Sequence, residues 1–132
     1  MKRNYHCPKC YGILNPNVKI ILKIECGGRQ ALLLFSPQPG NYDVIAPESF
    51  HLKKHDEVKF FCPLCSRDLT SKRDKSMAEI HFQTPGGHSG RVVFSRTYGH
   101  QETYFVTTEE VRSYGRHAGR DGVNFWGAGP KD

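Results

Sequence analysis

The sequence lacks any apolar stretch long enough to cross a bilayer as a helix, which takes about 20 residues. Residues 1–7 include basic side chains, but the apolar core of a signal peptide does not follow them. We therefore expect a cytoplasmic protein without a membrane anchor. Disulfide bonds are rare in such a reducing compartment, so the five cysteines of the chain are expected to have a different role.

Motifs of common catalytic sites are also missing. The chain has no Gly-x-Ser-x-Gly nucleophile elbow and no phosphate-binding P-loop. Residues 84–90 are rich in glycine, but they lack the lysine and the following helix of a P-loop, so they predict a tight turn. We expect that the protein is not an enzyme.

The amino-acid composition is not typical of a helical bundle. The 132 residues include 13 glycines and 8 prolines, and 37% are hydrophobic. This balance favours short strands joined by turns, and we expect a mostly β protein. The formal net charge of +6 permits contact with nucleic acid or with an acidic protein, although many basic proteins have no such partner.

What the sequence does contain is one cysteine pattern twice, Cys-Pro-x-Cys at residues 7–10 and again at 62–65. Proline at the second position fixes φ near −65° and helps each turn to curl around an ion. Two such turns that face each other form a tetrahedral four-thiolate site. The sequence therefore predicts one Zn²⁺ per chain, held by Cys7, Cys10, Cys62 and Cys65.

Disulfide bonds and redox chemistry are weaker hypotheses for these four cysteines. Structural disulfides need an oxidising compartment. A redox dithiol of the thioredoxin type occurs once, beside a βαβ pattern, and this chain shows no such pattern.

The two cysteine turns resemble those of the zinc-ribbon group and, more distantly, of rubredoxin. The resemblance covers residues 7–10, 62–65 and the approach strand 58–61, and it implies that each turn caps a hairpin and that both share one ion. Rubredoxin has glycine directly after each turn, where this chain has Tyr11 and Ser66, and its turns lie closer in sequence. Both differences make iron less expected than zinc. Parts of 49–63 are similar to small uncharacterised bacterial proteins, which implies no activity.

The residues between the two turns have the pattern of strands. Residues 18–26 alternate apolar and polar, Gly27 and Gly28 suit a hairpin turn, and 31–35 is an apolar return strand. A short strand at 42–46 and another at 57–62 lead to the second turn. We expect a zinc-ribbon-like domain over 1–70 with a β-hairpin inserted between its cysteine turns.

The second half predicts a small antiparallel β unit over 77–118, able to pack on the first as one domain. A polar segment at 68–76 is typical of a linker, and strands are expected at 78–83, 91–98 and 102–107. Thr107 and Glu110 have the spacing of a helix capping box, so we predict one short helix that stops at Gly115. A glycine-rich tail, 119–132, follows.

Basic residues near both cysteine turns suggest that the protein binds a negatively charged partner. If one metal joins the turns, these side chains come to one end of the molecule and can face phosphates of RNA or a ribonucleoprotein, or an acidic protein. The alternative is an ordinary solvated face, because Asp68 and Asp74 are mixed in. The residues are Lys2, Arg3, Lys9, Arg67, Lys72, Arg73 and Lys75.

Two further functions stay open. Phe125 and Trp126 in the tail could anchor a protein partner, which would make the chain an adaptor or an accessory subunit of a larger assembly, unless Trp126 folds back onto its own sheet. An iron-containing electron carrier is the lesser alternative.

Cys26 lies on the buried side of its strand and is expected in the core. The spacing of His51 and His55 would favour a second metal site only if both residues lay on a helix.

Overall fold

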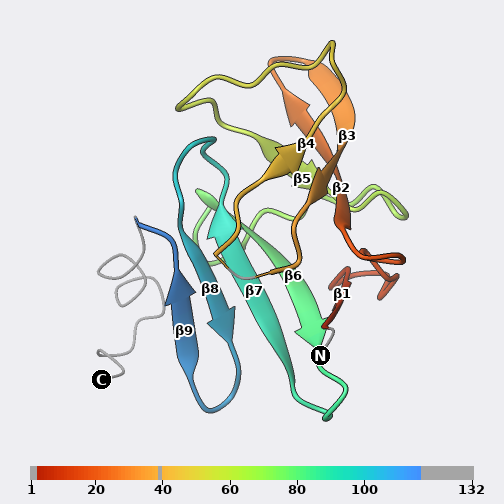
Figure 1. Cartoon of the computed structure of the whole chain (residues 1–132), viewed down its shortest axis with the longest axis vertical. Coiled ribbons are helices and arrows are strands. Elements are labelled where there is room, and N and C mark those ends of the chain that lie inside the picture. The colour runs from red at the N-terminus through yellow and green to blue at the C-terminus, as the bar shows by residue number, and fades with distance from the viewer. Residues whose placement is uncertain (1–2, 39, 117–132) are drawn as a thin grey trace.

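The computed structural model describes residues 3–38 and 40–116, and these form nine strands in two antiparallel sheets with no helix among them (Figure 1). This confirms the predicted mostly β class. The five-stranded sheet has the order β1-β6-β7-β8-β9, made of β1 (Asn4–His6), β6 (Met77–Gln83), β7 (Ser89–Ser95), β8 (Thr103–Val106) and β9 (Val111–Tyr114). The four-stranded sheet has the order β4-β3-β2-β5, made of β4 (Val44–Ile45), β3 (Arg29–Phe35), β2 (Ile20–Cys26) and β5 (Lys59–Phe61).

The first hairpin follows the sequence pattern closely. Gly27 and Gly28 have φ of 60° and 81°, the conformation that a two-residue turn requires and that glycine adopts without strain. Ile20, Leu22 and Ile24 are buried on one face of β2, as the alternation predicts. The same alternation includes Val18, but this residue lies outside the strand and is exposed.

The two cysteine turns belong to different sheets. The first turn follows β1, which pairs with β6 in the five-stranded sheet. The second turn follows β5, which pairs with β2 in the four-stranded sheet. The sequence predicts both turns within one zinc-ribbon-like domain over 1–70, whereas the strands that precede them belong to two different sheets.

One cluster of buried side chains lies between the sheets. It includes Leu22, Ile24 and Leu33 from the four-stranded sheet and Ile80 and Phe82 from the five-stranded sheet. A smaller cluster, which contains Met77, Val93 and Tyr104, is separate from it. The main core thus draws on both predicted segments, 1–70 and 77–118, and the boundary between them stays a prediction.

The predicted helix after Thr107 is wrong. The backbone N–H groups of Glu109 and Glu110 do donate to the Thr107 hydroxyl, each at 3.2 Å, as in a helix cap. Here they close the turn between β8 and β9, since the Thr107 N–H donates to the Glu110 carbonyl at 2.9 Å. The edge of β8 offers Val111–Tyr114 a ladder of backbone hydrogen bonds, and this pairing overrides the local helix signal.

The segment predicted as a linker also carries structure. Leu69 is buried, its N–H donates to the Phe60 carbonyl, and its own carbonyl accepts from the N–H of Glu79. Leu69 therefore bridges β5 and β6, one strand from each sheet. Within the described residues there is no helix of the length and apolar character that crossing a membrane demands.

Candidate metal centre

Four cysteine sulfurs meet where the two turns face each other. The Sγ atoms of Cys7 and Cys65 lie 3.8 Å apart, those of Cys10 and Cys62 lie 3.7 Å apart, and all four lie within 4.8 Å of one another. A tetrahedron with metal–sulfur bonds of about 2.3 Å has sulfur–sulfur edges of about 3.8 Å. A disulfide would need about 2.05 Å, and all five cysteines are free. The four sulfurs therefore have the spacing of a tetrahedral metal site.

The backbone of the first turn is folded around the Cys7 sulfur. The N–H groups of Lys9 and Cys10 point at Cys7 Sγ, at 3.2 and 3.4 Å, and the N–H of Gly12 points at Cys10 Sγ at 3.4 Å. Two backbone hydrogen bonds close the turn, from Tyr11 N–H to the Cys7 carbonyl and from Cys7 N–H to the Gly12 carbonyl. N–H groups aimed at sulfur stabilise a thiolate, which is the form that binds metal.

The second turn repeats this geometry. The N–H groups of Leu64 and Cys65 point at Cys62 Sγ, at 3.3 and 3.4 Å. The Ser66 N–H donates to the Cys62 carbonyl, and the Cys62 N–H donates to the Arg67 carbonyl. The two turns are thus near copies of each other, as their shared sequence predicts.

Burial and hydrogen bonding have opposite effects on the thiols. Burial raises the pKa of Cys7 and raises the pKa of Cys62 to about 12. The backbone N–H of Arg67 lowers the pKa of Cys65 to about 7. A divalent cation deprotonates its thiol ligands outright, so an ion would override the effect of burial on Cys7 and Cys62.

The site is closed by its own ligands. Cys7 and Cys62 are fully buried, Cys65 is half-buried and Cys10 is exposed. Four thiolates complete a tetrahedral shell and leave no position for a water molecule or a substrate. The arrangement suits a structural metal that holds the two sheets together.

The predicted basic residues differ in exposure and in their place in the fold. Lys9 and Arg67 are exposed beside the turns, and Lys72, Arg73 and Lys75 lie between the second turn and β6. Arg3 is instead half-buried, with its guanidinium carbon 5.2 Å from the centre of the Phe105 ring. Lys2, Phe125 and Trp126 lie outside the described residues.

The acidic residues in this region have local partners. The Asp68 carboxylate accepts hydrogen bonds from the N–H and hydroxyl of Thr70, and Asp74 accepts the same pair from Ser76. These bonds hold both carboxylates to their own loop. Lys72, Arg73 and Lys75 are exposed on this segment, and so is Asp68.

Neither the remaining cysteine nor the His51 and His55 pair belongs to the group of four sulfurs. Cys26 packs against the main core from the end of β2, as predicted, and no fifth ligand joins the group among the described residues. His51 and His55 are exposed on a segment that is not helical. Sequence reasoning missed His81, whose ring centre lies 5.7 Å from that of His6, because only the β1–β6 pairing brings it beside the first turn.

The chain was compared with family models, curated proteins and solved structures. No family model, no curated protein and no solved structure matches this chain. The class that the geometry defines is therefore a β protein with a four-cysteine metal-binding cluster.

Proposed function

We propose that this protein is a zinc-binding, non-catalytic binding module that contacts RNA or a ribonucleoprotein beside its metal centre. The observation that carries the proposal is the cluster of four cysteine sulfurs within 4.8 Å, contributed by turns from two different sheets. Four-thiolate tetrahedral sites suit zinc or iron. Zinc has no redox chemistry, which fits an ion whose role is to join two sheets.

The choice of an RNA partner rests on charge. Lys9 and Arg67 flank the metal site, and Lys72, Arg73 and Lys75 follow on a loop whose two carboxylates have local partners. Phosphate contacts need cations that can approach a nucleic-acid backbone, and the exposed side chains of Lys72 and Lys75 are candidates for such contacts.

Binding of a mixed-sequence single-stranded RNA, measured by fluorescence anisotropy over a range of salt concentrations, tests the proposal. The variant Arg67→Ala, Lys72→Ala, Arg73→Ala should bind more weakly, and the slope of log K against log salt should flatten by about 2, since each lost phosphate contact removes about 0.7. The matched control is Lys19→Ala, Lys53→Ala, Arg112→Ala, which removes the same charge from exposed positions elsewhere.

Equal weakening of both triple variants would mean that net charge alone attracts RNA. No weakening in either would leave the basic loop as a solvated face and would move the adaptor function, through Phe125 and Trp126, to first place. The electron-carrier alternative has one observation in its favour, the N–H groups aimed at sulfur in both turns. A ferric-thiolate absorption band in the freshly purified protein would contradict zinc and move this alternative forward.

A further inference from the structure

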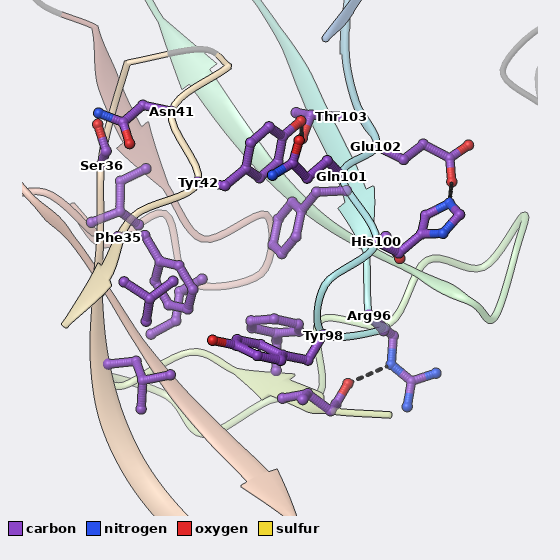
Figure 2. Close-up of a pocket in the computed structure, with 18 of the residues that line it drawn as sticks. Phe35, Ser36, Asn41, Tyr42, Arg96, Tyr98, His100, Gln101, Glu102 and Thr103 are labelled. Atoms are coloured by element: carbon purple, nitrogen blue, oxygen red, sulfur yellow. Dashed lines mark hydrogen bonds and ion pairs between the residues drawn. The ribbon is translucent and has the colours of Figure 1, made fainter. Parts of the chain in front are cut away.

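A cleft of about 360 Å³ opens between the two sheets, apart from the metal centre (Figure 2). Its walls come from both sheets, with Phe35 and Val44 on one side and Phe94 and Phe105 on the other. Protein interiors are close-packed and contain few voids larger than a water molecule. Ligand pockets begin at about 300 Å³, so this cleft is of a size for a small molecule.

The inner lining is aromatic and aliphatic. The ring centres of Phe35 and Phe60 lie 5.9 Å apart, and those of Phe60 and Phe94 lie 5.0 Å apart at an interplanar angle of 83°. Phe35, Val44, Leu52 and Phe94 are only partly buried, although they pack against the core. Apolar side chains that line a cleft and remain partly open can gain free energy from an apolar ligand.

Residues 36–38 and 40–43, between β3 and β4, line one side of the cleft and are bonded to the five-stranded sheet. The Tyr42 hydroxyl donates to the Tyr114 carbonyl at 3.0 Å, and it therefore accepts from the Thr103 hydroxyl at 2.9 Å. The Tyr5 hydroxyl donates to the Pro37 carbonyl at 2.6 Å. These bonds tie Pro37 and Tyr42 to the five-stranded sheet, so the protein's own contacts fix this side of the cleft.

Two of the charged groups that line the cleft, Glu102 and Arg96, are already engaged by the protein. Glu102 is buried and accepts from the Tyr104 hydroxyl at 2.5 Å, and its other oxygen lies 3.0 Å from His100 Nε2. Arg96 donates to the carbonyls of Val58 and Lys75. Figure 2 shows both side chains turned toward their partners and away from the space beside Phe35 and Tyr98.

The remaining polar groups at the rim are neutral or solvated. Ser36, Asn41, Gln101 and Tyr98 border the opening, and Tyr98 is 41% exposed. Lys54 and Asp43 also border it, but both are exposed to water. A charged ligand would lose its hydration without gaining a buried counter-charge, whereas an uncharged one loses little.

We propose that the cleft between the two sheets binds a small, uncharged, largely aromatic molecule. The probe is N-phenyl-1-naphthylamine, which is uncharged at neutral pH and fluoresces in apolar surroundings. Its comparison ligand is anilinonaphthalene sulfonate, which has the same ring skeleton and one negative charge. On the full chain the uncharged probe should bind saturably, one per chain, at least tenfold more tightly than the sulfonate.

Two adjacent residues of β4 provide matched variants. Val44 lines the cleft, while Ile45, whose side chain is on the opposite face of the strand, is 53% exposed and does not line it. Val44→Trp should fill the cleft and abolish probe binding, and Ile45→Trp should leave it within about twofold. Circular dichroism confirms that each variant is folded.

A third variant decides the matter if Val44→Trp does not fold. Tyr98→Ala removes an exposed rim side chain but keeps the backbone hydrogen bonds of Tyr98 with Asp56 and His55, so the fold is preserved. It should weaken probe binding several-fold. Absence of probe binding to the full chain, equal affinity for the sulfonate, or equal binding by all folded variants would overturn the proposal.

Discussion

Tyr11 and Ser66 adopt the same left-handed backbone conformation, with φ of 61° and 64°, at the same position of the two cysteine turns. Each directly follows the second cysteine of its turn, and each donates its N–H to the carbonyl of the first cysteine. Glycine stands at this position in rubredoxin, which the turns resemble. The turn geometry is thus kept here at the cost of strain in two residues with side chains.

Replacing Ser66 with glycine should stabilise the protein. Relief of a left-handed conformation gains about 1–2 kcal/mol, and the added freedom of glycine in the unfolded chain takes back part of it, leaving about 0.5–1 kcal/mol. Urea unfolding at saturating metal measures the change. Ser49→Gly is the control, since Ser49 is exposed and its φ is not positive, and it should not stabilise.

Tyr11→Gly should gain less than Ser66→Gly. The Tyr11 ring lies 6.0 Å from the His6 ring, and this contact is lost with the side chain. Urea unfolding of the two variants side by side measures the difference. A larger gain for Tyr11→Gly than for Ser66→Gly would contradict a stabilising role for the contact with His6.

Loss of one metal ligand should separate the two sheets. Structural zinc contributes about 10 kcal/mol or more in small zinc domains, which is comparable to the stability of a whole domain. Cys62→Ser, or a strong chelator, should therefore abolish the cooperative unfolding transition of the protein. Circular dichroism during unfolding measures this transition. Cys26→Ala removes a half-buried thiol outside the cluster and should cost about 1 kcal/mol with metal content unchanged. Equal metal loss from both variants would show that the ligand set is wrong.

Gly90 is expected to tolerate no side chain. A Cβ there would overlap the Val106 carbonyl oxygen of β8 and lie 3.0 Å from the Phe82 ring of β6. The carbonyl belongs to the sheet ladder and cannot move freely, so Gly90→Ala should cost about 2–3 kcal/mol. Gly86→Ala is the control, because its nearest neighbour would be 3.7 Å away. Thermal unfolding that shows equal stability of the two variants would contradict the register of β7 between its neighbours.

The acid stability of the protein should depend on His81. Burial lowers the pKa of His81. The neighbouring His6 and Arg91 lower this pKa further, whereas Glu79 raises it. The unfolded chain therefore binds more protons, and stability is lost as pH falls below about 6.5, the ordinary histidine value. His81→Gln cannot titrate, so its free energy of unfolding should fall less between pH 7 and pH 5.5. His88→Gln, which replaces a histidine in an exposed loop, is the control variant.

Short sequence patterns predicted the parts of the fold that are determined by residues adjacent in sequence. Gly27 and Gly28 define a two-residue hairpin whatever surrounds them, and the doubled cysteine turn specifies its own hydrogen bonds. The signal at Thr107 is local but ambiguous, because a helix cap and a hairpin turn use the same hydroxyl and the same N–H groups. The edge of β8 decides between them, and its position cannot be read from residues 107–115.

Features built from distant segments could not be predicted. The pairing of Tyr5 with Phe82 places the first cysteine turn on a different sheet from the second, and no local pattern encodes that register. The cleft beside Phe35 and Phe94 arises from how the two sheets pack, since each strand alone shows only ordinary apolar alternation. The grouping of Cys7, Cys10, Cys62 and Cys65 was predictable because the spacing of the doubled cysteine pattern is typical of a four-thiolate site.

X-ray absorption spectroscopy of the freshly purified protein tests the proposed zinc centre most directly. A structural zinc site predicts a zinc edge and a single shell of four sulfur atoms at about 2.3 Å. An iron edge, a shell containing nitrogen or oxygen, or oxidised cysteines without metal would contradict it.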